Sequence, residues 1–475
     1  MADYPTLALI VAGTPVREVS ETMPVTNPAT GETLGRLPMA SEADVDRAVK
    51  AAAGAAEAWR DLGASGRAAI LRRVAPALRA NADRLARLIT LELGKPLAES
   101  RGEVAVAAAL WDWNVEEGLR GYGRVVPGPT GGRRLVLREP LGPVAGFSSW
   151  NAPLITPSRK IGAALAAGCP IVMKPAEETP ATALALATIL VEAGVPGGVL
   201  SVLFGDAPMI SSRLLADARI RGVSFTGSTA VGIEIGQAAM AGMKPATLEL
   251  GGHAPVLIFD DVNPGAVARA AVAAKFRNAG QICTSPTRFV VQDGAYEAFR
   301  EAFLAAASEI VVGDGMEQGT TMGPLAHARR LDWIEGLVSD ATERGARILA
   351  GGARMAGGGF FFAPTILEGV PADARAMNEE PFGPLALLCR FRDEVEAMAE
   401  ANRLPVGLTA YAFTSDGSRA IRLADGIRAG NVIVNGWAAS APETPFGGWG
   451  LSGLGKEGGS EGLEAFQSLK YVSLS

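Results

Sequence analysis

Short apolar runs alternate with amphipathic segments along two stretches of this chain, a pattern typical of strands followed by helices. In the first stretch, the apolar runs predict strands at 143–147, 170–174, 199–204, 223–225 and 247–250. The segments between them predict helices near 156–167, 180–193, 208–217 and 229–241. Such a series of strand–helix–strand units favours a parallel, doubly wound sheet.

A second alternation runs from Pro255 to Val434 and predicts a second domain of the same kind. Its strands are expected near 255–259, 287–292, 360–367, 384–391, 409–414 and 431–434. The expected fold class is therefore α/β, with two doubly wound α/β domains.

An early strand and two helices are expected before the first sheet. The apolar run Leu7–Val11 is too short for a membrane span and is interpreted as a strand. Ser41–Asp44 resembles a capping box that starts a helix to about residue 60. A second, long helix is expected from Ser65 to Leu93, ending at Gly94.

Two segments have the character of projecting strands. The stretch from Gly121 to Leu141 is rich in glycine and then strand-like at Arg134–Arg138, which suits a hairpin. Ser468–Leu474 is a further strand at the C-terminus. Projecting strands often pair with another subunit, so these segments predict a small β oligomerisation element.

Composition narrows the classes of partner and compartment. The chain of 475 residues is 48% hydrophobic and 20% charged, with a net charge of −6 and no run of like charges. These values favour a compact protein with small-molecule partners, and they give no electrostatic basis for binding nucleic acid or a membrane. Three widely spaced cysteines and two histidines form no disulfide framework and no metal motif, so we expect no metal and a cytoplasmic location.

A carboxylate and a thiol stand out because each lies among glycines in an apolar neighbourhood. Glu249 is part of Leu248–Gly252, and Cys283 is part of Gly280–Thr284. A thiol can attack a carbonyl carbon, and a nearby carboxylate can activate the water that releases the product. The alternative is that Cys283 is a small buried residue, as Cys169 and Cys389 are expected to be.

Polar residues and glycines follow the predicted strands of the first sheet, at the edge where open α/β sheets bind ligands. They are Trp150, Asn151, Lys174, Glu177, Gly205, Gly227, Ser228 and Glu249. Gly227–Gly232 joins a strand to a helix and could bind a pyrophosphate. The GxGxxG matches at 448–453 and 453–458 follow no predicted strand and are interpreted as accidental.

Several motifs together resemble the NAD(P)-dependent aldehyde dehydrogenases, over essentially the whole chain. They are Trp150–Asn151, Lys174–Glu177, Phe225–Thr229, Glu249–Gly252, Gly280–Cys283, Glu380–Pro384 and Pro445–Gly448. The resemblance implies an NAD-binding domain at 1–121 and 142–252, a catalytic domain at 253–450, and oligomerisation elements at 122–141 and 466–475. It also implies a homodimer or homotetramer.

The same resemblance implies roles for five residues in catalysis. Cys283 would add to the aldehyde, and the Asn151 amide and the backbone N–H of Cys283 would stabilise the oxyanion. Glu249 would be the general base that hydrolyses the resulting thioester. Lys160 and Glu457 match positions associated with proton relay, although either could be an ordinary interdomain charge.

The cofactor residues implied by the resemblance lie in both domains. They are Trp150, Lys174, Glu177, Gly227, Ser228, Leu250, Glu380 and Phe382. For Lys174 and Glu177, a solvated pair at a helix start is the alternative. A carboxylate bonded to the adenosine ribose would repel a 2′-phosphate, so Glu177 favours NAD over NADP, which stays possible.

The substrate residues point to a small aldehyde that carries a carboxylate. Arg159, Arg288 and Glu117 lie in segments that resemble semialdehyde dehydrogenases of the α-ketoglutaric or succinic type, and arginine suits carboxylate recognition. Both arginines could instead be structural ion-pair partners. Ser149, Ala152 and Gly450 depart from the family pattern, and the small Ala152 leaves the particular semialdehyde open.

Other functions remain as alternatives. The substrate could be an aromatic or simple aliphatic aldehyde. A coenzyme A acylating relative would typically lack the general base, whereas Glu249 is present. A non-catalytic protein on the same fold would have no need for Cys283, Glu249 and Asn151 together.

Overall fold

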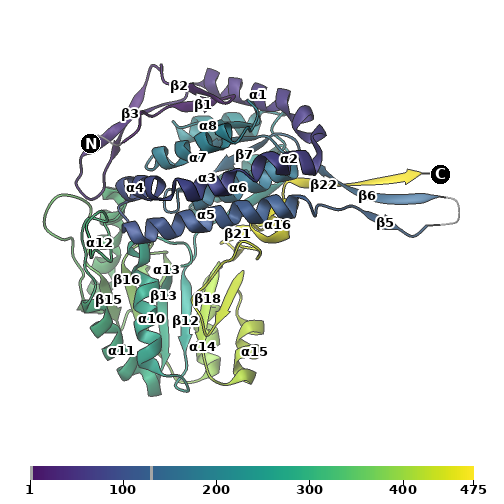
Figure 1. The fold of residues 1–475 in the computed structure, drawn as a ribbon. Helices are drawn as coiled ribbons and strands as arrows, with labels where there is room; N and C mark the ends of the chain where they lie inside the picture. The colour runs from purple at the N-terminus through teal and green to yellow at the C-terminus, as the bar shows by residue number, and fades with distance from the viewer. Residues whose placement is uncertain (1–3, 129–131, 475) are drawn as a thin grey trace.

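The computed structural model describes residues 4–128 and 132–474, and its core is two α/β sheets placed end to end (Figure 1). The first sheet has eight strands in the order β2 (Thr14–Val16), β1 (Leu9–Val11), β9 (Leu200–Val202), β8 (Ile171–Lys174), β7 (Val144–Phe147), β10 (Gly222–Thr226), β11 (Ala246–Glu249) and β21 (Gly453–Leu454). Strands β7 to β11 are parallel, and the chain direction across the sheet reverses between β7 and β10. This is the doubly wound arrangement that the sequence predicts.

Helices cover both faces of this sheet. They are α1 (Glu42–Asp61), α2 (Gly63–Leu71), α3 (Val74–Ala80), α4 (Ala82–Leu93), α5 (Leu97–Gly118), α6 (Ile155–Ala167), α7 (Pro180–Glu192), α8 (Ala207–Ala216), α9 (Thr229–Ala241) and α16 (Gly459–Glu464). Their apolar faces form one buried cluster with the strands, centred on residues such as Trp59 and Trp111. The Trp111 indole also donates a hydrogen bond to Ser158, which ties α5 to α6.

The second sheet has seven strands in the order β14 (Arg347–Ala350), β15 (Thr365–Glu368), β16 (Leu385–Phe391), β13 (Pro286–Gln292), β12 (Ala254–Ile258), β18 (Thr409–Phe413) and β19 (Asn431–Val434). Its helices are α10 (Pro264–Phe276), α11 (Asp293–Ser308), α12 (Ala328–Glu343), α13 (Arg375–Asn378), α14 (Glu394–Ala401) and α15 (Gly417–Gly426), with a 3-10 turn at Arg277–Gly280. The predicted strand at 360–367 begins later, at Thr365, and β14 was not predicted.

The predicted hairpin projects away from both sheets (Figure 1). Strand β5 (Arg124–Val126) pairs with β6 (Arg133–Pro140), and the C-terminal strand β22 (Gln467–Leu474) pairs along the whole of β6. Two further small sheets, β3–β4 and β17–β20, had no clear sequence signal. They join Thr22–Thr26 to Thr33–Pro38, and Val406–Gly407 to Trp449–Gly450.

The long helix expected from Ser65 to Leu93 was wrong, because the chain forms α2, α3 and α4 instead. Pro76 lies in the first turn of α3 and lacks the N–H that would continue the hydrogen-bond ladder of α2. The helix boundaries at Ser41 and Gly94 are confirmed. Ser41 and Asp44 form a reciprocal capping box, and Gly94 ends α4 with a left-handed φ of 86°.

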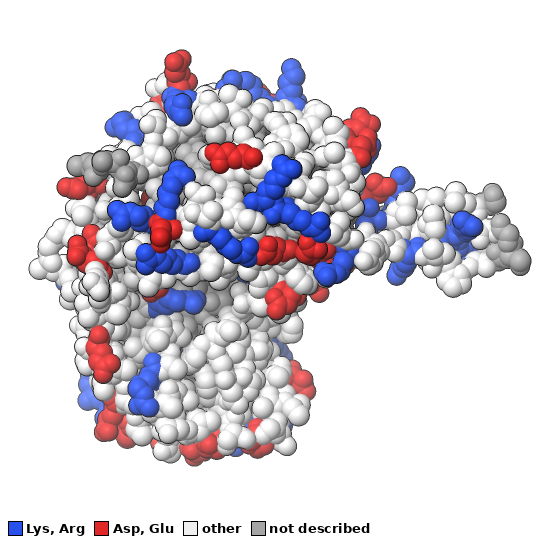
Figure 2. All heavy atoms as spheres, in the orientation of Figure 1, with Lys and Arg blue, Asp and Glu red and all other residues white. Residues whose placement is uncertain are grey.

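Charged side chains of both signs are interspersed over the face drawn in Figure 2. Among the helices of residues 4–128 and 132–474, none combines the length and the apolar character that a membrane crossing requires.

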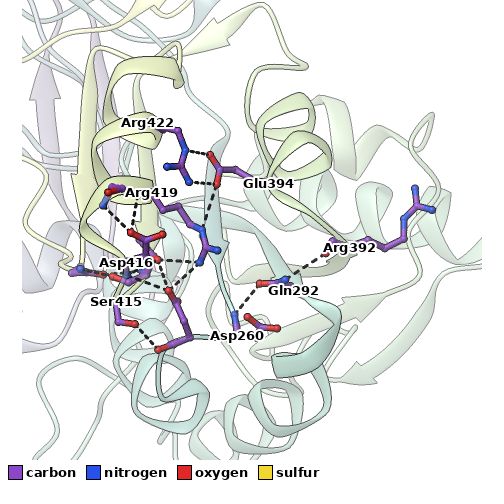
Figure 3. A network of polar contacts seen from close by, with 12 residues as sticks. Asp260, Gln292, Arg392, Glu394, Ser415, Asp416, Arg419 and Arg422 are labelled. Carbon is purple, nitrogen blue, oxygen red and sulfur yellow. Dashed lines mark hydrogen bonds and ion pairs between the residues drawn. The ribbon is translucent and has the colours of Figure 1, made fainter.

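A polar network lies at the carboxyl ends of the second sheet (Figure 3). Arg422 of α15 donates two hydrogen bonds of 2.7 Å to Glu394 at the start of α14. Arg419 donates to Asp261, which follows β12, while Asp416 caps α15. These side chains bond to one another, so we interpret the network as one that stabilises this end of the sheet.

Gly94 tests how tightly the first part of the chain packs on the second. A Cβ there would lie 2.4 Å from Cγ of Pro324, whereas a Cβ at Gly63, which also has a positive φ of 66°, would meet nothing within 4 Å. We expect Gly94→Ala to lower the apparent Tm more than the control Gly63→Ala, because both add the left-handed strain of about 1–2 kcal/mol but only Gly94→Ala adds a clash. Equal Tm values in thermal denaturation would contradict this packing.

Candidate active site

The thiol and the carboxylate meet where the two sheets face each other. Glu249 is the last residue of β11, and Cys283 lies in the loop before β13, so the carboxyl end of one sheet meets the amino end of the other. A Cβ at Gly252 would lie 3.2 Å from the carbonyl oxygen of Cys283. The Cys283 thiol and the Glu249 carboxyl group lie close enough to shift each other's pKa.

Burial changes the acidity of both groups. Desolvation, together with the charge of Glu457, raises the pKa of Glu249 to about 8. Desolvation and the charge of Glu249 raise the pKa of the Cys283 thiol well above its usual value. Oε1 of Glu249 is buried without a hydrogen-bond partner in the described part of the chain, so it is open to a water or substrate group.

The Asn151 amide is held beside the thiol loop from two directions. Its Nδ2 donates to the carbonyl of Gln281 at 3.1 Å, and its Oδ1 accepts a hydrogen bond from the Ser149 hydroxyl at 2.7 Å. Ser149, one of the departures from the family pattern, therefore fixes which way the amide points. Because an amide nitrogen carries two hydrogens, the second remains available to an oxyanion.

Lys160 and Glu457 form a buried ion pair next to Glu249. The Lys160 ammonium donates to Glu457, to Ser224 at 3.0 Å and to Thr226 at 2.8 Å, which uses all three of its protons. Both charges affect the pKa of Glu249, in opposite directions. The pair is therefore electrically coupled to the carboxylate, in addition to joining α6 to the C-terminal segment.

Arg159 also faces this space, one residue before Lys160 on α6. Its guanidinium is buried, lies 4.5 Å from the centre of the Phe446 ring, and donates to the Ser440 hydroxyl at 3.3 Å. Its positive charge lowers the pKa of both Glu249 and Cys283. Within residues 4–128 and 132–474 it has no ion-pair partner, and its Nε has no acceptor.

The first group of cofactor residues lies around the point where the winding of the first sheet reverses. Glu177 accepts a hydrogen bond from the Gly205 N–H at 3.0 Å and lies 2.5 Å from the Lys174 ammonium. Ser228 caps α9, whose first turn contains no acidic residue. A helix N-terminus and a carboxylate at this edge fit the pyrophosphate and ribose of a dinucleotide.

The second group includes residues of the other domain, and it lies close to the start of α9, because a Cβ at Gly251 would lie 2.6 Å from Glu380 Oε2 and 3.5 Å from Thr229 Oγ1. Glu380 accepts a hydrogen bond from the Gly252 N–H at 3.0 Å, and burial raises its pKa to about 7. The Phe382 and Trp150 rings meet edge to face at 5.4 Å. Leu250 packs against Gly232 at the start of α9, so these side chains line a continuous surface.

Gly227 has a structural role besides its place in the cofactor motif. Its N–H donates to the Glu249 carbonyl at 3.1 Å, which continues the pairing of β10 with β11. A Cβ at Gly227 would lie 2.5 Å from the Phe225 ring, so only glycine fits without a shift. Because Gly227 has no side chain, a phosphate could approach the backbone of the loop before α9 closely.

Arg288 and Glu117 each contact other groups of the protein, so these contacts do not support their predicted substrate role, which stays a prediction. Arg288 is fully buried within the second sheet, where it pairs with Glu400 at 2.5 Å and donates to the His253 carbonyl. Glu117 pairs with Arg120 and accepts a hydrogen bond from Ser460, at the end of α5 that packs beside the C-terminal end of α6. Structural ion pairing, the alternative for Arg288, is what the contacts support.

Sequence reasoning missed groups that frame the nucleophile. Asn278 Nδ2 donates to the carbonyls of Asn151 and Gln281, both at 3.1 Å. Tyr411 donates to the Thr284 carbonyl at 2.8 Å, and burial raises the pKa of its hydroxyl although the positive charge of Arg277 opposes this shift. Arg277 and Asn278 could have been noticed because they lie just before the Gly280–Cys283 motif. No sequence motif pointed to Tyr411.

Known proteins match this chain over almost its whole length. The aldehyde dehydrogenase family model matches residues 16–472. The chain is 44% identical over 455 residues to the NADP(+) succinate-semialdehyde dehydrogenase GabD of Escherichia coli, covering 96% of this chain and 94% of that protein. It is 43% identical over 456 residues to the glutarate-semialdehyde dehydrogenase of Pseudomonas putida, covering 96% and 95%.

A solved structure gives the same result in three dimensions. The crystal structure of succinate-semialdehyde dehydrogenase from Burkholderia pseudomallei matches with a TM-score of 0.97 and 42% identity, covering 100% of this chain and 98% of that one.

The pKa of Glu249 predicts how product release depends on pH. A general base must be deprotonated, so we expect the rate of thioester hydrolysis to rise with pH and to level off above about 8. Glu457→Gln removes a negative charge and should move this limb to lower pH, whereas Lys160→Gln removes a positive charge and should move it to higher pH. The measurement is kcat against pH on variants that keep the native circular dichroism.

Glu461→Gln is the matched control, because Glu461 lies in the exposed first turn of α16, four residues after Glu457. Solvent should screen its charge, and its profile should match that of the unmodified protein. If kcat depended on pH in the same way in all three variants, this would contradict an electrostatic effect of the Lys160–Glu457 pair on Glu249.

Proposed function

Because this chain belongs to the aldehyde dehydrogenase family, we propose that it oxidises a small carboxylate-bearing aldehyde to the acid, with NAD as the preferred hydride acceptor. One observation supports this substrate class. The buried Arg159 guanidinium lies close enough to Cys283 to lower the pKa of its thiol, and among the described residues it has no carboxylate partner. An unpaired buried charge is costly, and the anionic end of a substrate would neutralise it.

In the first step, the Cys283 sulfur adds to the aldehyde carbon while the thiol proton passes to the Glu249 carboxylate, and the oxyanion of a thiohemiacetal forms. The developing oxyanion accepts hydrogen bonds from the free hydrogen of Asn151 Nδ2 and from the backbone N–H of Cys283. The support for this is the orientation of the amide, which Ser149 and the Gln281 carbonyl hold from opposite sides.

In the second step, the thiohemiacetal carbon loses a hydride and becomes a thioester on Cys283. When bound, NAD(P) would supply the hydride acceptor, and Glu380, Phe382 and Leu250 would hold its nicotinamide end. Trp150, Lys174, Glu177, Gly227 and Ser228 would hold the adenosine and pyrophosphate end.

In the last step, Glu249 takes a proton from a water, and the hydroxide attacks the thioester to release the acid. The free Oε1 of Glu249 and its pKa of about 8 suit a base that works near neutral pH. A cavity of about 10 Å³ beside Lys160 and Glu457 has roughly the volume that one water needs, and we propose that it serves proton transfer away from Glu249.

Glu177 supports a preference for NAD. Its carboxylate stands at the carboxyl ends of β8 and β9, held by the Gly205 N–H. There it can accept both ribose hydroxyls of NAD, while the 2′-phosphate of NADP would meet a like charge.

We also propose a homo-oligomer, dimer or tetramer, joined in part through the projecting sheet. Large apolar side chains are exposed on it: Tyr122, Val125, Leu469, Tyr471 and Leu474. An exposed apolar edge of this kind is stable when another subunit covers it.

Arg159→Met tests the substrate class. We expect kcat/KM for succinic semialdehyde to fall about 10–100-fold more than kcat/KM for butanal, which has the same chain length without the carboxylate, because only the semialdehyde loses a charge-assisted hydrogen bond, whereas the pKa change at Cys283 and Glu249 affects both. Initial rates of NADH formation measure both.

The control is Arg87→Met, at an exposed position of α4, which should leave both substrates unaffected. A protein that prefers butanal or benzaldehyde to every semialdehyde would favour the alternative of an uncharged substrate. So would an equal loss for both aldehydes in Arg159→Met.

Glu177→Ser tests the cofactor preference. Removing the carboxylate should raise the ratio of kcat/KM for NADP over NAD by at least about 10-fold, since a like-charge contact disappears. Glu192→Gln, at the exposed end of α7, should leave the ratio unchanged. A protein that already prefers NADP, with the same ratio in Glu177→Ser, would contradict the role of Glu177.

A further inference from the structure

Three charged residues follow one another at intervals of four: Lys95 lies just before α5, and Glu99 and Glu103 lie in its first two turns. This spacing places Glu99 and Glu103 on one face of the helix. Their carboxylates do not point to solvent. Each accepts hydrogen bonds from the backbone of a different active-site segment.

Glu103 caps α6, which begins at Ile155, shortly after Asn151. Its Oε1 accepts the N–H groups of Leu154 at 2.8 Å and Ile155 at 3.2 Å, and its other oxygen pairs with Lys95. Helix α6 has no side-chain cap of its own at Leu154. A cap supplied by a different helix fixes where α6 begins relative to α5, which a local cap does not do.

Glu99 holds the loop that carries the thiol. Its Oε2 accepts the N–H of Asn278 at 2.8 Å. Asn278 and Ala279 have φ values of 49° and 52°, in the left-handed region that is strained for residues other than glycine. Such backbone persists only where surrounding contacts hold it in place.

The two segments are also bonded to each other. Asn278 Nδ2 reaches the carbonyls of Asn151 and Gln281, and Asn151 Nδ2 reaches the same Gln281 carbonyl. The Asn151 amide and the thiol loop therefore form one network, and Glu103 and Glu99 hold its two ends from a single rigid helix.

We propose that Glu99 and Glu103 are positioning residues that set the distance between the Asn151 amide and the backbone N–H of Cys283. The inference rests on the proposed function, because it takes these two groups as the oxyanion donors. Oxyanion stabilisation depends steeply on geometry. Loss of either carboxylate should therefore slow the chemical step while the affinity for aldehyde and cofactor is largely kept.

The test compares Glu99→Ala, Glu99→Gln and Glu103→Gln with Glu116→Gln, a surface residue of the same helix that pairs with Arg72. Two rates are measured per folded enzyme: kcat for succinic semialdehyde with NAD, and acylation of Cys283 by p-nitrophenyl acetate without cofactor. We expect Glu99→Ala to lower both rates about 10–100-fold with KM nearly unchanged. Glu99→Gln, which keeps an acceptor oxygen, should recover a large part, and Glu116→Gln should behave as the unmodified protein.

Glu103→Gln leaves the buried Lys95 ammonium without its carboxylate partner. The double variant Lys95→Met, Glu103→Gln removes this unpaired charge, and we expect the same fall in kcat and in the acylation rate. The proposal is overturned if rates per folded enzyme are unchanged, or if the loss is confined to KM. The ester assay tests the positioning role of Glu99 and Glu103 separately from aldehyde oxidation. If the protein oxidises no aldehyde but p-nitrophenyl acetate still acylates Cys283, the proposed function fails, while the acylation rates of the variants still test the positioning role.

Discussion

The site depends on the burial of a thiol and a carboxylate in one desolvated space, at the seam between the carboxyl end of β11 and the amino end of β13. Burial raises the pKa of both groups, and the charge of Glu249 raises the pKa of the Cys283 thiol further. Bringing them together requires two sheets whose ends face each other, since neither sheet alone supplies both. The Lys160–Glu457 pair then balances the charge around Glu249. The remaining groups serve to align reactants with this pair.

Much of the fold could be predicted because its main strands are buried on both faces and appear as continuous apolar runs, as in β7 and β12. Local capping chemistry likewise identified the starts and ends at Ser41 and Gly94. What the sequence did not reveal depends on distant partners. Strand β21 is two residues long and exists through its pairing with Leu248 and Glu249 of β11. The break of the long helix was readable at Pro76 and was missed because the apolar period continues across it.

The candidate site shows the same division between local and distant information. Cys283, Glu249 and Asn151 lie in short motifs, and the structure brings them together. Arg159 and Arg288 had equal standing in the sequence, each a few residues from a catalytic group. Their difference lies in partners: Glu400, which neutralises Arg288, is 112 residues further along the chain. No local pattern carries that information, so only three-dimensional packing separates the unpaired arginine from the paired one.

Backbone strain marks the same seam. Asn278 and Ala279 lie before Cys283, and Phe382 lies two residues after Glu380. All three have a positive φ, which is uncommon for residues other than glycine. Each strained position is held by side chains from elsewhere: Asn278 by Glu99, and the Phe382 carbonyl by Arg330 at 2.9 Å. Strain of this kind persists only when the surrounding contacts outweigh it. The bonds from Glu99, Asn278 and Arg330 therefore hold these segments in their strained conformation. In the mechanism that we propose, this keeps the oxyanion donors in place before the substrate arrives, because a looser loop would relax toward ordinary backbone angles and carry the thiol away from Asn151.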